Sequence, residues 1–144
     1  MKDHAADAEA LFRAFAARNS LTIRKIDDPN VELVMEIPRQ AGLSFDLTVG
    51  LQNGDELNIG FEGFWSYFFP FDQKRELVSL LLDGIVSGES RLAVHTQFGF
   101  VVKRVLERYA DEDWEPIYHA LGYGVPFMAT KVAYVSNDDA RSRT

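Results

Sequence analysis

The chain contains no cysteine. It therefore has no disulfide bond, no thiolate metal ligand and no cysteine nucleophile, a composition compatible with a reducing compartment. Long hydrophobic runs are also missing. Outside an aromatic stretch described below, apolar clusters are as short as Leu80–Leu82, far below the ~20 residues that span a bilayer. Because the first residues are acidic where a signal peptide is apolar, we expect a cytoplasmic protein without a membrane partner.

Basic residues are in the minority, with 15 lysines and arginines against 22 aspartates and glutamates, for a formal net charge of -7. This excess of negative charge opposes attraction to phosphate backbones, so we expect no nucleic-acid partner. The length of 144 residues fits one domain, and 47% hydrophobic with 26% charged residues is typical of globular chains.

The signatures of common enzymes are missing as well. The chain has no Walker loop, no His-Glu-x-x-His motif and no Gly-x-Ser-x-Gly turn. Gly122-Tyr123-Gly124 begins like a dinucleotide-binding fingerprint, but Phe127 stands where the third glycine is required. We predict no cofactor and no catalytic residue, and an enzyme is the less favoured class.

Hydrophobic periodicity predicts the elements of the first half of the chain. Apolar residues recur at helical spacing over residues 4–18. Apolar and polar residues then alternate in four short segments, which indicates strands with one buried face. These predicted strands cover residues 21–26, 31–37, 43–51 and 57–61. Asn53-Gly54 favours a type I′ turn, and such short connections predict a four-stranded antiparallel meander.

The pattern continues with a second helix over residues 72–87, which Gly88 ends. A hairpin with strands near 92–96 and 100–109 follows, turning at residues 97–99. We expect the second helix to cover the sheet.

The last third is less regular. Residues 114–121 have helix-like apolar spacing although Pro116 lies among them, and residues 127–135 resemble a last strand. Residues 136–144 are predicted to form a flexible polar tail. The predicted fold class is α+β: one domain over residues 1–135, in which an antiparallel sheet (the meander, the second hairpin and the last strand) carries two main helices.

The most unusual stretch is residues 61–71, where seven of eleven residues are aromatic. One interpretation is a core segment that fills the gap between the sheet and the second helix. The other is a surface or pocket that contacts a ligand or partner, because consecutive rings of an extended segment point in different directions. Under the second interpretation the candidate binding residues are Phe64, Trp65, Tyr67 and Phe68.

Charge is distributed unevenly along the chain. Residues 31–62 contain six acids and one arginine, a net charge of -5, and Glu32 and Glu36 are candidate residues for contact with a basic protein. The second hairpin carries Arg91, Lys103, Arg104 and Arg108 against Glu107, a net charge of +3. Such a two-sided molecule favours a homodimer, whereas the alternative interpretation is an ordinary solvated surface.

One cluster of titratable residues resembles a catalytic or metal site. Asp111, Asp113, Glu115 and His119 are close in sequence, and His95 is the other histidine in the folded part of the chain. If residues 115–119 were helical, Glu115 and His119 would share a face. An acidic first helical turn followed by an ordinary histidine explains the same residues, so we predict no metal site.

Three functions remain open. The favoured one is a protein-interaction module, such as an inhibitor, an immunity-type protein or a chaperone-like adaptor, that binds a basic protein. The second is a domain that holds a small apolar ligand in an aromatic-lined pocket. The third is an enzyme that depends on a metal or on a histidine.

Overall fold

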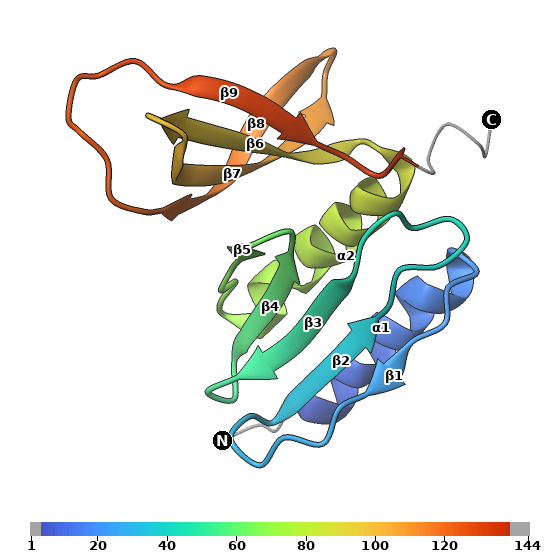
Figure 1. The fold of residues 1–144 in the computed structure, drawn as a ribbon. Helices are drawn as coiled ribbons and strands as arrows, with labels where there is room; N and C mark the ends of the chain where they lie inside the picture. Colours follow the sequence, from blue (N-terminus) through green and yellow to red (C-terminus); the bar gives the residue numbers. More distant parts are fainter. Residues whose placement is uncertain (1–3, 139–144) are drawn as a thin grey trace.

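The computed structural model describes residues 4–138, and the two helices and the antiparallel sheets in it confirm the α+β class. Figure 1 shows the elements in their order along the chain. They are α1 (Ala5–Arg18), β1 (Arg24–Lys25), β2 (Leu33–Ile37), β3 (Leu47–Gln52), β4 (Glu56–Phe61), β5 (Phe64–Trp65), α2 (Phe71–Ser87), β6 (Ser90–Gln97), β7 (Phe100–Ala110), β8 (Asp113–Leu121) and β9 (Lys131–Val135).

The first sheet is an antiparallel meander in the order β1-β2-β3-β4-β5. Both helices lie on one of its faces, as Figure 1 shows, and the other face is not covered by a helix. The alternation seen in the sequence explains this arrangement, because Met35, Val49 and Ile59 pair across three strands and are all fully buried. On the helix side, the rings of Phe12 and Phe15 of α1 complete this core.

Several hairpins turn through two residues with positive φ angles, as type I′ turns require. The predicted turn at Asn53 (φ 53°) and Gly54 (φ 73°) is confirmed. The pairs with the same geometry elsewhere are Glu62 and Gly63 (φ 49° and 82°), Phe98 and Gly99 (53° and 82°), and Asp111 and Glu112 (52° and 66°). The second of these pairs confirms the expected hairpin at residues 97–99.

The second sheet has the strand order β8-β7-β6-β9. It begins directly after α2, which ends at Gly88 in the left-handed conformation (φ 89°), as the sequence predicted. The sheet projects beyond α2 and lies above the first sheet in the view of Figure 1. The expected last strand is shorter than predicted and pairs with β6. The sequence predicted one antiparallel sheet that contains the meander, the second hairpin and the last strand, whereas the structure divides these strands between two sheets.

The helix-like spacing of residues 114–121 does not correspond to a helix, because this segment is the edge strand β8. Pro116 pairs with Glu107 and Tyr118 pairs with Leu106, which leaves Ile117 as an extra residue in a bulge. The bulge shifts the alternation of apolar residues by one position. The resulting spacing of apolar residues along the sequence is similar to that of a helix. An edge strand also tolerates the missing N–H of a proline.

An aromatic contact joins the two sheets. The ring centroid of Tyr118 lies 5.7 Å from that of Phe64 and 5.2 Å from that of Phe68. The Tyr118 hydroxyl also accepts a hydrogen bond of 3.2 Å from the backbone N–H of Tyr67. The aromatic stretch thus holds one strand of the second sheet against the edge of the first.

Asn137 is part of the fold, although the sequence placed it in the flexible tail that was expected from residue 136. Only 3% of it is exposed. Its Oδ1 accepts a hydrogen bond of 2.9 Å from the N–H of Ser44, and its Nδ2 donates to the carbonyl oxygens of Gly42 and Val86 at 2.8 Å each. These bonds tie the end of β9 to α2 and to the loop before β3. Residues 139–144 of the expected tail lie outside the described residues.

We predict that Asn137→Ala lowers the free energy of unfolding by about 2–4 kcal/mol, because it leaves several buried backbone groups without partners. Urea denaturation followed by circular dichroism measures the effect. The matched control is Asp138→Ala, which removes an exposed side chain and should change the free energy of unfolding by less than ~0.5 kcal/mol. Equal stability of both variants would show that the Asn137 side chain does not anchor the chain end.

Candidate functional site

The structure separates the four candidate aromatic residues. Phe64 and Phe68 are buried in the core, so a partner does not reach their side chains. Tyr67 is exposed, and the ring of Trp65 lies edge-on to it at a centroid distance of 6.3 Å. The aromatic stretch is therefore mainly a core segment, and its accessible members are Trp65, Tyr67 and Phe69, of which Phe69 is the most exposed, at 62%.

The two candidate acids lie on the uncovered face of the first sheet, and each already has a local partner. Glu36 Oε1 accepts a hydrogen bond of 2.8 Å from Arg24 Nη2, an ion pair in contact with solvent. Glu32 Oε1 accepts one of 2.9 Å from the N–H of Gly54 and so supports the β3–β4 turn. Both residues therefore have a structural role whether or not a partner binds.

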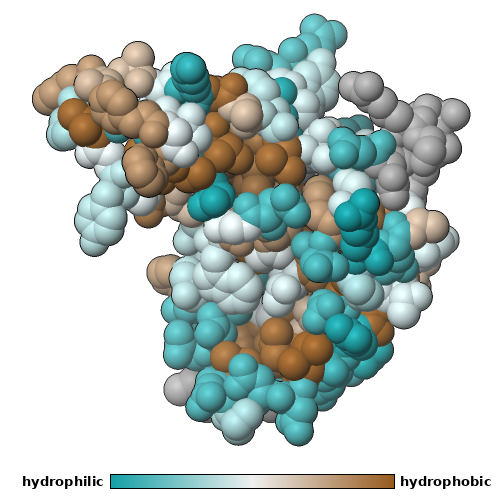
Figure 2. All heavy atoms as spheres, in the orientation of Figure 1, coloured by the Kyte–Doolittle hydropathy of each residue, from teal (hydrophilic) through white to brown (hydrophobic). Residues whose placement is uncertain are grey.

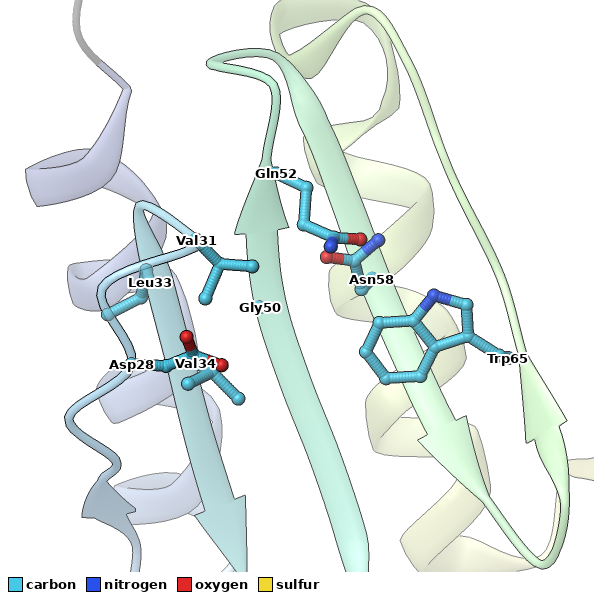
Figure 3. Close-up of a pocket in the computed structure, with 8 residues that line it drawn as sticks. All are labelled: Asp28, Val31, Leu33, Val34, Gly50, Gln52, Asn58 and Trp65. Atoms are coloured by element: carbon cyan, nitrogen blue, oxygen red, sulfur yellow. The ribbon is translucent and has the colours of Figure 1, made fainter.

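A groove lies on this uncovered face, and Figure 3 shows its lining. We call it the sheet groove; it is lined by Asp28, Val31, Leu33, Val34, Gly50, Gln52, Asn58 and Trp65. The strand register places Val34, Gly50 and Asn58 in one row across β2, β3 and β4. The indole of Trp65 forms one wall, and the cavity has a volume of about 160 Å³.

Two glycines shape the sheet groove. A Cβ atom added to Gly50 would lie 2.8 Å from the carbonyl oxygen of Leu33, so only glycine leaves this floor open. A Cβ atom added to Gly60 would collide with the ring of Trp65. The indole therefore lies flat across the backbone of β4, where a larger residue would push it away.

The floor of the sheet groove contains a buried amide with an unpartnered oxygen. Asn58 is only 1% exposed, and its Nδ2 donates a hydrogen bond of 3.1 Å to the carbonyl oxygen of Ser66. That bond fixes the orientation of the amide. Its Oδ1 has no hydrogen-bond partner among the described residues, and neither does the Oε1 of Gln52. Leaving a buried acceptor unpaired costs about 1–3 kcal/mol, so these oxygens are unusual.

Trp65 also borders a second cavity, between the two sheets. This inter-sheet cavity has a volume of about 190 Å³, and its other walls come from β7, β8 and the residues after them. Its lining includes Val101, Arg104 and Leu121 from the second sheet and Gly63 from the β4–β5 turn. A Cβ atom on Gly63 would meet the guanidinium group of Arg104, which explains the close approach of the two elements.

Large apolar side chains gather in solvent at the far end of the second sheet. We call this surface the apolar end; its members are each at least 74% exposed and are Phe98, Phe100, Leu121, Tyr123 and Phe127. Figure 2 shows apolar residues gathered at the upper left, where this end of the sheet projects. Phe98, Phe100 and Tyr123 border a cavity of about 330 Å³. The sequence interpretation missed this surface because these residues belong to no aromatic cluster along the chain.

Two rings of the apolar end are held in an unfavourable backbone conformation. Phe98 has a φ of 53° and Phe127 a φ of 64°. For a bulky residue this left-handed region is rare and costs about 1–2 kcal/mol, whereas asparagine and glycine tolerate it. The chain thus carries strain at two positions where the side chain points into solvent.

The cluster of titratable residues that resembles a catalytic or metal site in the sequence is not assembled in the structure. Glu115 pairs with Arg108 and His119 pairs with Val105. Because the two partners are three residues apart on β7, Glu115 and His119 face opposite sides of the sheet. Within residues 4–138, no group of three or more histidine, aspartate or glutamate side chains is placed to hold a metal ion.

The second hairpin, whose sequence has a net charge of +3, exposes less positive charge than that number indicates. The guanidinium carbon of Arg91 lies between the rings of Trp114 and Tyr134, at 3.9 Å and 3.8 Å from their centroids. Its Nε donates a hydrogen bond of 2.8 Å to Glu107. Arg91 therefore holds β6, β8 and β9 together and is largely neutralised.

No family model matches the chain, and the comparisons with curated proteins and with solved structures gave no significant match either. No helix within the described part of the chain is long and apolar enough to cross a membrane.

The imidazole of His95, on β6, has a lowered pKa. Partial burial is the main cause that lowers the pKa of His95, the positive charges of Lys103 and His119 lower it further, and Glu107 acts in the opposite direction. Its Nδ1 lies 2.9 Å from the hydroxyl of Thr130. The folded protein binds a proton on His95 less well than the unfolded chain does, in which the pKa of histidine is ~6.5. Neutral His95 therefore contributes to the free energy of unfolding above this pH, and the contribution decreases as the pH falls below it.

We predict that an NMR titration gives His95 a pKa below 6.5, and that Lys103→Met raises it. The free energy of unfolding should fall when the pH is lowered from about 6.5, and it should fall less in the variant. An unchanged His95 pKa in Lys103→Met would contradict the role assigned to the lysine charge.

Proposed function

We propose that this protein is a protein-interaction module that binds a partner polypeptide through the apolar end of the second sheet. The observation that carries the proposal is the exposure of five large apolar side chains at one end of one sheet. Soluble monomers rarely expose contiguous apolar patches beyond a few hundred Å², and larger ones mark interaction sites. Aromatic rings supply most of this surface, as in the centres of protein interfaces.

The backbone strain supports the same conclusion. At φ 53° and φ 64°, asparagine or glycine in place of Phe98 and Phe127 would relieve strain and improve solubility. Strained residues of this kind concentrate at functional sites, where the loss of stability is balanced by binding. Phe98 and Phe127 therefore fit a surface that is retained for recognition.

The chemistry of the partner follows from charge. The chain carries a net charge of -7, and residues 31–62 contribute -5 of it. Two copies of such a chain repel each other, whereas a basic partner is attracted and guided to the surface. We propose a cytoplasmic partner that presents an apolar surface and carries a net positive charge, rather than a second copy of this chain.

Site-specific photo-crosslinking in the host tests this proposal. A benzophenone amino acid at position 123, within the apolar end, should give an adduct with another protein. The same amino acid at position 80, where Leu80 is exposed on α2, should not give that adduct. The proposal fails if position 123 gives no adduct, or gives only the adduct between two copies of the chain.

We also predict that Phe98→Asn stabilises the fold while it weakens binding. The free energy of unfolding should rise by about 1 kcal/mol because asparagine tolerates the left-handed conformation. The yield of the position-123 adduct should fall at least about fivefold, as expected when an interface aromatic worth ~1 kcal/mol is lost.

The matched control uses the other turn with the same geometry. Asn53 has the same φ of 53° and also precedes a glycine, so Asn53→Phe should lower the free energy of unfolding and leave the adduct yield unchanged. If Phe98→Asn lowered stability, the ring would be a structural part of the turn and not a binding residue.

A further inference from the structure

We propose that the sheet groove is a binding site for a guanidinium group, supplied by an arginine side chain of the partner or by a free small guanidine. The inference goes beyond the apolar end, which lies on the other sheet. It rests on the unpartnered oxygens, the carboxylate and the indole that line one cavity.

The hydrogen-bonding groups of the groove require a donor. The buried Oδ1 of Asn58 and the Oε1 of Gln52 are acceptors without a partner, and an added Cβ on Gly50 would lie 3.4 Å from that Oδ1. Since Gly50 forms the floor of the cavity, the Asn58 oxygen is directed toward whatever occupies it. A ligand with several N–H groups satisfies both oxygens, whereas an anion or a purely apolar group satisfies neither.

The surrounding charge and the aromatic wall favour a cation. Asp28 lines the groove, and its Oδ1 accepts a hydrogen bond of 2.9 Å from the N–H of Asn30. Its other carboxylate oxygen has no hydrogen bond within residues 4–138. The indole of Trp65 turns its edge toward Gly50 (Figure 3), and its outward face, beside the groove, is the surface on which a planar guanidinium group can stack. Together they favour guanidinium over a neutral amide.

The size of the groove fits the planar head group. Cavities of about 150 Å³ hold a ring the size of benzene, and the sheet groove has about 160 Å³. Val31 and Val34 form the apolar side of the lining, where the methylene groups of an arginine side chain would lie. Figure 3 shows these valines across Gly50 from the indole.

The test is an NMR titration of the full-length protein with Nα-acetyl-arginine methylamide. We expect the amide of Gly50 and the indole N–H of Trp65 to shift, with a dissociation constant of about 1–10 mM, as is typical for so small a ligand. The indole N–H of Trp114, in the second sheet, and the amide of Gly88 are the reference signals.

Two comparisons separate the guanidinium site from unspecific binding. The citrulline analogue of the probe has nearly the same shape without the charge and should bind at least about fivefold more weakly. Asp28→Asn should weaken binding about fivefold while it retains the turn at residues 28–30. Asp27→Asn, which removes a charge of the same turn that does not line the groove, should change the dissociation constant less than twofold.

The outcomes are distinct. The inference is overturned if the Gly50 and Trp65 signals do not move by 20 mM probe, or if the citrulline analogue binds equally well. If the probe binds and also reduces the position-123 adduct, the guanidinium group belongs to the partner. If it binds without affecting the adduct, the site takes a free small guanidine. Because the adduct is formed at the apolar end, the proposed function can fail while this site is retained.

Discussion

The contact of Tyr118 with Phe64 and Phe68 determines how the two sheets are arranged. One tyrosine of an edge strand places its ring against two buried rings of the aromatic stretch and its hydroxyl on the backbone of that stretch. This contact sets the position of β8, and through β8 the position of the hairpin it shares with β7. The inter-sheet cavity lies between the same elements and is bordered by Trp65, by the turn at Gly63 and by residues of β7 and β8.

The buried core and the proposed recognition surface lie in different parts of the chain. The helix-facing side of the first sheet consists of fully buried aliphatic residues, with Leu81 and Leu82 of α2 packed against them. The far end of the second sheet has exposed rings and two strained residues. Substitutions at that end are therefore expected to change what the protein binds more than whether it folds.

Much of the fold could be predicted from local patterns. The helices over residues 5–18 and 71–87, the alternating strands and the Asn53-Gly54 turn follow from periodicity and from the conformational preferences of single residues. The bulge at Ile117 could not be predicted in this way, because its extra residue is defined only by the register with β7. The buried position of Asn137 depends on partners more than 50 residues away in the sequence.

The candidate site was harder to predict than the fold. Alternation shows that a strand has two faces, but not which face a helix covers or where that face is hollow. Of the candidate residues chosen from the sequence, Trp65 lines the sheet groove, while Phe64 and Phe68 are core residues. Gly50 and Asn58 have no distinctive sequence signal, since their importance depends on being neighbours across two strands. The apolar end likewise becomes a surface only through the pairing of β6, β7 and β8.

The shared wall formed by Trp65 has a thermodynamic consequence. The indole borders both the sheet groove and the inter-sheet cavity, so a rotation of its side chain that enlarges one space alters the other. An occupant of either space therefore changes the free energy of filling its neighbour. By thermodynamic linkage, the factor by which the first occupant changes the affinity for the second equals the factor by which the second changes the affinity for the first. The two spaces, one on the first sheet and one between the sheets, are in this way coupled through the torsion angles of a single residue.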